Sequence, residues 1–129
     1  MHRTFLILAA VIAAVTVGLG AFAAHALKGL VSDKAITTFE TAVRYQFYHV
    51  LALFIVGILY RQYRNGFVLN AGRCFLFGML LLSGSLYALA IFQAIVSPGL
   101  RWIGAITPVG GLLFITGWLL LGFGILKGK

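Results

Sequence analysis

The side chains that could do acid–base or metal chemistry gather in one part of this sequence, between its first and second apolar runs. Glu40 and Arg44 lie four residues apart, and so do Tyr45 and His49, so each pair would share one face of a helix. His25 precedes them at the end of the first apolar run. Imidazoles titrate near neutrality, and a nearby carboxylate would let them transfer protons. We therefore treat these five residues as a candidate polar site.

Structural roles would explain the same residues without any chemistry. Glu40 and Arg44 can neutralise each other at a membrane interface, and Tyr45 can anchor a helix there. The histidines can hydrogen-bond a neighbouring helix, which is worth about 0.6 kcal/mol on average in membranes. A metal site is not indicated, because the sequence has no HExxH spacing and its single cysteine lies outside this stretch. We predict no metal and no cofactor.

The composition places this candidate site in a membrane. Hydrophobic residues make up 62% of the 129, and charged residues only 9%, whereas soluble domains carry about 25% charged residues. A soluble enzyme, a disordered tail and a nucleic-acid module are therefore excluded as classes. The net charge of +8 does not argue for nucleic acid as a partner, because the charges flank apolar runs, as they do beside membrane spans.

Uncharged apolar runs predict helices that cross a bilayer core of about 30 Å, which takes about 20 helical residues. The predicted fold is all-α: an integral membrane four-helix bundle formed by the whole chain, 1–129, as a single transmembrane domain. Asn65-Gly66 and Ser97-Pro98-Gly99 favour turns between consecutive spans. We place the four spans at about 4–25, 44–62, 73–95 and 103–126.

Residues 32–43 form the one stretch of mixed charge between spans, and we predict an amphipathic surface helix there. Ser32 can cap its N-terminus, and Asp33 suits the first turn because the helix dipole favours a negative charge. Apolar residues then recur at helical spacing into the second span, so the two helices can be continuous with a bend.

The first run has an alternative interpretation as a secretory signal, because small residues near its end fit A-x-A cleavage. It is, however, longer than the usual apolar stretch of about 7–15 residues. It also carries Ala10, Ala14 and Gly18 at the spacing that lets helices approach closely. We expect the first run to be retained as a span.

Small residues in the third and fourth runs predict close helix packing. Gly110, Gly117 and Gly124 recur every seven residues and so form one stripe along a helix, and Gly84 lies in the third run. Membrane helices associate through such small residues. We interpret these glycines as seams inside the bundle, with an oligomer interface as the alternative. Pro108 suits the first turns of a helix, although it could also mark a broken helix.

Basic residues predict the orientation of the chain in the membrane. Six lie on the face that holds both termini and the loop after the second span, whereas four lie on the other face with both acids. Cytoplasmic loops carry the excess of Lys and Arg. We therefore expect both termini to be cytoplasmic.

Four ordered motifs run through most of the chain. They are GAFAAHAL at residues 20–27, FETA with YQ and H at 39–49, GSLY at 84–87, and ITPVGG with GW at 106–118. Together they resemble the YgdD-like family of small bacterial inner-membrane proteins of unknown function, and human transmembrane protein 256 is similar. Ala23 stands where the family usually has Gly, and Leu82 where Phe is common.

The resemblance implies four spans in a bacterial inner membrane, with the first helix retained. It implies no activity, because the family has none assigned. It also implies that six residues are motif positions that could form one site. They are His25, Glu40, Tyr45, His49, Tyr87 and Thr107.

The expected function is not enzymatic. We expect a small bundle that binds membrane lipids, or that assists a larger membrane complex as an accessory or assembly partner, with a homo-oligomer as a further possibility. The alternative is an oligomeric channel or proton-coupled transporter with a polar vestibule at His25, Glu40 and His49. A membrane enzyme that uses a His–Glu pair on a lipid or quinone is a third hypothesis.

Overall fold

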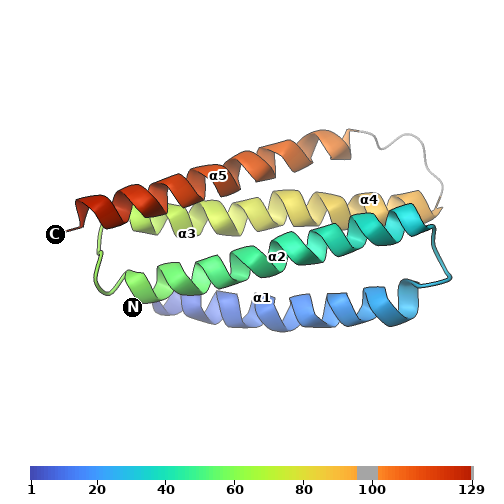
Figure 1. The fold of residues 1–129 in the computed structure, drawn as a ribbon, viewed down its shortest axis with the longest axis horizontal. Coiled ribbons are helices and arrows are strands. Elements are labelled where there is room, and N and C mark those ends of the chain that lie inside the picture. Colours follow the sequence, from blue (N-terminus) through green and yellow to red (C-terminus); the bar gives the residue numbers. More distant parts are fainter. Residues whose placement is uncertain (96–101, 129) are drawn as a thin grey trace.

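The computed structural model describes residues 1–95 and 102–128, and this part of the chain is helical without strands (Figure 1). Four helices are long and apolar enough to cross a membrane. The prediction of an all-α four-helix membrane bundle is therefore confirmed. The elements are α1 (Arg3–Phe22) with the π-helical turn η1 (Ala23–Leu27), α2 (Asp33–Leu59), α3 (Gly66–Gly78), the π-helical turn η2 (Met79–Ser83), α4 (Gly84–Ile95) and α5 (Ile103–Lys127).

Polar side chains set the starting points of three helices by accepting a hydrogen bond from a free backbone N–H in the first turn. The N–H of Phe5 donates to Nδ1 of His2 at the start of α1. Ser32 caps α2 in the same way, as its sequence position predicts, and Asn65 caps α3. Between α1 and α2 the chain turns at Gly29, whose φ of 86° favours glycine.

Residues 32–43, predicted as an amphipathic surface helix that can continue into the second span, form the N-cap and first turns of α2, in one continuous helix with that span. No Gly or Pro interrupts the chain between Asp33 and Val56, so nothing breaks the helical hydrogen bonds. Ala35, Phe39 and Ala42 on this segment are buried inside the bundle. The helix that contains the second predicted span therefore starts at Asp33 and ends at Leu59.

The helix that contains the third predicted span begins at Gly66, seven residues before the predicted start at 73. Arg73 lies inside α3 with an exposed side chain. A long Arg stem can lie along apolar surface while its guanidinium reaches the membrane interface. The helices that contain the first and fourth predicted spans have bounds within two residues of the predicted ranges. The turn predicted at Ser97-Pro98-Gly99 lies outside the described residues.

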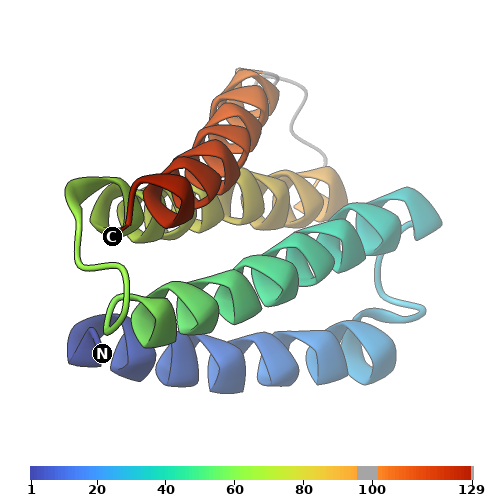
Figure 2. The same cartoon turned by 60° about the vertical axis from the view of Figure 1, so that its left-hand side comes forward.

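The bundle consists of two helix pairs: α1 with α2, and α5 with the α3–η2–α4 helix. Helices α2 and α3 lie at the centre and join the two pairs. Helix α1 packs antiparallel on α2, while α5 crosses over the continuous α3–η2–α4 helix (Figure 2). The core between them contains Phe5, Val50, Leu53, Val68 and Phe75. Both termini lie at the same end of the bundle (Figure 1), as the topology prediction requires.

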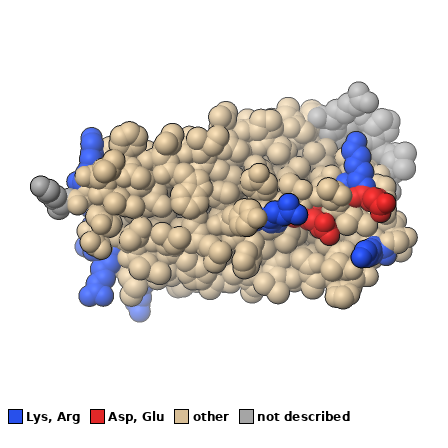
Figure 3. Space-filling view, viewed as in Figure 1, with Lys and Arg blue, Asp and Glu red and all other residues tan. Residues whose placement is uncertain are grey.

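The two ends of the bundle differ in charge (Figure 3). Among the described residues, all charged side chains at the end with the termini are basic, and they come from the start of α1, the loop after α2, the first turns of α3 and the end of α5. Both acids of the chain, Asp33 and Glu40, belong to the first turns of α2, at the other end. We call the end with the termini the basic end.

Candidate functional site

His49 is a buried residue of α2 that contacts two other helices. Its side chain is only 6% exposed, and its ring stacks on that of Phe114 with centroids 3.4 Å apart and planes 3° apart. Phe75 of α3 and Trp118 of α5 lie next to it, with ring centroids at 5.6 and 6.2 Å. The aromatic cluster of these four residues joins α2, α3 and α5, with the partly exposed Trp118 at its outer edge.

Both ring nitrogens of His49 have partners, and the partners define its protonation. Nδ1 lies 2.7 Å from the carbonyl oxygen of Tyr45, which can only accept, so Nδ1 carries the proton. Nε2 lies 3.3 Å from the indole Nε1–H of Trp118, which can only donate, so Nε2 is the acceptor. This neutral tautomer satisfies the imidazole completely. The arrangement is what the structural interpretation of His49, a hydrogen bond to a neighbouring helix, predicts.

Tyr87 belongs to a second polar contact that ties α4 to α2. Its hydroxyl donates to Oε1 of Gln46 at 2.7 Å, and Gln46 is 8% exposed. One turn earlier, Ser83 donates to the carbonyl oxygen of Ala42 at 2.9 Å. The sequence gives little indication of the bond between Ser83 and Ala42, because its acceptor is a backbone carbonyl. Both bonds fix the third span on the second.

Thr107 makes a similar contact between the third and fourth spans. Its hydroxyl lies 2.6 Å from that of Ser85, which also reaches the carbonyl oxygen of Leu82 at 2.9 Å. At the basic end, the Asn65 amide donates to the carbonyl oxygen of Gly124 at 2.8 Å. Thr107 therefore serves helix packing, while Asn65 both caps α3 and holds the end of α5.

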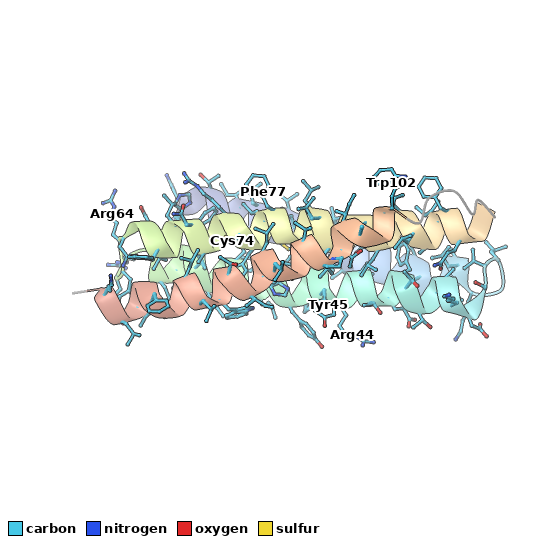
Figure 4. All side chains as sticks on the ribbon, turned by 90° about the horizontal axis from the view of Figure 1, so that it is seen from above. Arg44, Tyr45, Arg64, Cys74, Phe77 and Trp102 are labelled. Atoms are coloured by element: carbon cyan, nitrogen blue, oxygen red, sulfur yellow. The ribbon has the colours of Figure 1, made fainter. Side chains whose placement is uncertain are left out.

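The remaining predicted site residues are not brought together. His25, Glu40, Arg44 and Tyr45 are exposed, and Figure 4 shows Arg44 and Tyr45 pointing away from the bundle. Glu40 and His49 are nine residues apart on one straight helix, which separates them by about 13 Å along its axis. Within residues 1–95 and 102–128, no three or more His, Cys, Asp or Glu side chains converge on a possible metal position.

Three of the four predicted packing glycines do form a seam, between α5 and the α3–η2 segment. Gly110, Gly117 and Gly124 are buried. A Cβ on Gly117 would come within 2.7 Å of the Phe75 ring, and one on Gly110 within 2.8 Å of the backbone Cα of Leu82. Gly78, which the prediction missed, receives the Phe114 ring on the other side of this seam.

The prediction for Gly84 is wrong. It is exposed, and a Cβ there would meet nothing within 4 Å. The reason is that Gly84 faces an open groove instead of a neighbouring helix. Glycine spacing alone does not distinguish a helix–helix contact from an open groove, because small residues occur in both.

The groove runs between α1 and the α3–η2–α4 helix, above Gln46 of α2, and has a volume of about 560 Å³. This lies within the range of about 300–1,000 Å³ that is usual for small-molecule sites. The π-helical turn η2 lies in its wall, and such turns occur often at functional sites. Its lining residues are Ile12, Val15, Leu19, Gln46, Arg73, Leu76, Phe77, Met79, Leu80, Gly84 and Tyr87.

The walls of the groove are apolar, and its polar residues lie at different positions along its length. Arg73 lies toward the basic end, whereas Gln46 and Tyr87 lie farther from that end and are hydrogen-bonded to each other. Phe77 is on the side of the bundle opposite to Arg44 and Tyr45 (Figure 4). Sequence reasoning missed the groove because its lining residues look like ordinary lipid-facing side chains. Arg73, a charge within an apolar helix, was the one available indication.

Comparison with known proteins gives a family but no activity. Residues 19–111 match the family described as "Protein of unknown function (DUF423)". A UPF0382 membrane protein of Staphylococcus haemolyticus is 46% identical over 120 residues, which cover 92% of either chain. The UPF0382 membrane protein YwdK of Bacillus subtilis is 42% identical over 120 residues, covering 92% of this chain and 93% of its own. No solved structure matches the chain.

Proposed function

The chain belongs to the DUF423 family of uncharacterised membrane proteins, and from this premise we propose that it is a non-enzymatic bundle that binds a membrane lipid. The bound part would be an acyl chain in the groove between α1 and the α3–η2–α4 helix. The narrower resemblance to YgdD-like proteins and to human transmembrane protein 256 remains a prediction from the motifs.

The observation that carries this proposal is the groove itself. Large apolar side chains of α1 and of α3–η2 line it, and it is open along one side. In a bilayer the outer surface of a four-span bundle faces hydrocarbon, so an apolar recess on that surface is filled by acyl chains unless a protein covers it. An α-helix is about 10–12 Å across with its side chains. A groove of about 560 Å³ therefore suits a single acyl chain better than it suits a partner helix.

The vestibule of the channel hypothesis receives less support. Of the three residues proposed for it, His25 and Glu40 are exposed, and His49 is buried with both ring nitrogens bonded. An accessory role in a larger complex agrees with lipid binding, because a lipid can mediate contact between membrane proteins. A partner helix seated in the groove is the competing occupant and is an outcome of the test below.

For the setting, we propose the inner membrane of a bacterium with both termini in the cytoplasm. The basic end supports this orientation, because cytoplasmic surfaces carry the excess of Lys and Arg. A reporter enzyme that works only in the cytoplasm should be active when fused to the C-terminus. Activity only of a reporter that requires export would contradict the orientation.

Photo-crosslinking tests the lipid proposal. A phospholipid with a photoreactive group in one acyl chain is reconstituted with the protein, and crosslinked peptides are mapped by mass spectrometry. We expect crosslinks to concentrate on the groove residues of α1 and α3, and to fall several-fold in Gly84→Leu, because the new side chain would project into open space in the groove.

Gly122→Leu is the matched control, since Gly122 of α5 is also exposed, does not line the groove and has nothing within 4 Å of an added Cβ. It should leave the crosslinks unchanged. Crosslinks spread evenly over all lipid-facing helices in both variants would refute a defined acyl-chain site. A photoreactive residue placed at Leu80 in native membranes distinguishes the competing occupant, since crosslinks from it to another membrane protein would favour the partner helix.

A further inference from the structure

We infer that the lipid held in the groove is an anionic phospholipid whose phosphate binds Arg73 while one acyl chain extends toward Tyr87. This inference rests on the proposed function and specifies its ligand. It follows from three features of the groove: its charged end, its length and an inner end whose polar groups are already hydrogen-bonded to each other.

Arg73 is the charged residue that lines the groove, and among residues 1–95 and 102–128 its guanidinium makes one hydrogen bond. One guanidinium nitrogen, Nη1, donates to Oδ1 of Asn70 at 3.2 Å, and the side chain is exposed. A guanidinium has five N–H donors, and its planar fork matches two oxygens of a phosphate. The bond to Asn70 also restrains the side chain on its own helix. Arg73 is therefore positioned to receive an oxyanion.

The charge of the surrounding end supports an anionic headgroup over a neutral one. Besides Arg73, this end carries Arg3, Arg61, Arg64 and Lys127, and neither of the two acids of the chain lies there. Basic side chains near a membrane surface attract anionic lipids in proportion to their number. The opposite end mixes both signs (Figure 3), so the attraction favours a headgroup at the end where Arg73 lies.

The length of the groove matches one leaflet of a bilayer. Arg73 and Gly84 are eleven residues apart on one continuous helix, which places them about 16 Å apart along its axis. Half of a hydrocarbon core of about 30 Å is about 15 Å. A lipid with its phosphate at Arg73 would therefore reach Gly84 near the bilayer midplane, where its acyl chain ends.

The inner end of the groove offers little to a polar ligand. Gln46 and Tyr87 face it, but the Tyr87 hydroxyl is already committed to the Gln46 amide. A second headgroup or a polar cargo passing along the groove would have to break this bond in an apolar setting. An acyl chain requires no partner there, so the groove suits a ligand with one charged end and one apolar end.

Native mass spectrometry with competing lipids tests this inference. The full chain is equilibrated in detergent with equal amounts of phosphatidylglycerol and phosphatidylcholine that have identical acyl chains. We expect retention of phosphatidylglycerol in preference, and a loss of this preference by about tenfold in Arg73→Gln, because a charge-assisted hydrogen bond is removed. Arg73→Lys should retain part of the preference, since it keeps the charge without the fork.

Lys127→Gln is the control, because it removes one charge from the same end on α5, away from the groove. Equal loss of preference in Lys127→Gln and Arg73→Gln would overturn a site at Arg73 and leave only a diffuse charge effect. Retention of both lipids equally by the unmodified protein, with loss of both in Gly84→Leu, would overturn the headgroup inference but keep the acyl-chain site. Retention of neither lipid would contradict both.

Discussion

The α3–η2–α4 helix presents two faces that are packed in opposite ways. On the face toward α5, glycines on both helices let the backbones approach, and Phe114 fills the notch at Gly78. On the face toward α1, large side chains such as Phe77 and Leu80 meet equally large ones of α1 across an open groove. Lipid supplies no hydrophobic drive for helices to close, so side-chain size decides their separation. The same helix thus makes a closed seam on one side and a lipid-sized recess on the other.

The largest effect is expected from a change in the closed seam. Gly110→Leu should destabilise the bundle by about 3 kcal/mol or more, because its Cβ would overlap the backbone of Leu82, which cannot move aside as a side chain can. The free energy of unfolding in mixed detergent–SDS micelles, followed by circular dichroism, measures this loss.

Gly122→Leu again serves as the control for Gly110→Leu, since the same side chain enters open space on the same helix. It should leave the stability unchanged or raise it by up to about 1 kcal/mol, through better helix propensity. Similar losses in the two variants would mean that the seam is no tighter than the lipid-facing surface.

A smaller effect is expected in the aromatic cluster that links the seam to α2. Trp118→Phe keeps a ring in place but removes the donor to Nε2 of His49. We expect a loss of about 1 kcal/mol, within the range measured for interhelical hydrogen bonds in membranes. Trp102→Phe, at an exposed tryptophan, should cost nothing measurable. A larger loss of stability in Trp102→Phe than in Trp118→Phe would mean that Nε2 of His49 does not accept the hydrogen bond that the geometry indicates.

The smallest effect is expected at the charged residues of α2. Glu40→Gln should change the unfolding free energy by less than about 0.5 kcal/mol, since the side chain is exposed. It should also leave proton flux across liposomes unchanged. A clear fall in flux would revive the channel hypothesis and move the functional site from the groove to this part of α2.

The sequence predicted what depends on local chemistry. Apolar runs located the four helices, Ser32 marked the start of α2, and the seven-residue spacing of Gly110, Gly117 and Gly124 identified the seam. Apolar spacing from residue 32 into the second span also indicated that the two helices can be continuous, and α2 is one helix from Asp33 to Leu59.

What depends on helix pairing could not be predicted. In a membrane, the side chains that face lipid and those that face another helix are both apolar, so periodicity does not separate them. Ala10, Ala14 and Gly18 looked like a packing face of α1 but are exposed, whereas Phe5, Ala9 and Thr16 are buried. Gly84 was assigned to a packed seam for the same reason. The groove could not be predicted because it depends only on which helices pack against each other.

A crystal structure grown from a lipidic phase that contains phosphatidylglycerol tests the central claim most directly. We expect elongated density along Phe77 and Leu80 that ends in a phosphate at Arg73, with α5 packed closely on the opposite face of the α3–η2–α4 helix. Two results would contradict it: α1 packed directly on α3 and α4 with no groove between them, or a groove without ordered lipid while Arg73 points away from it.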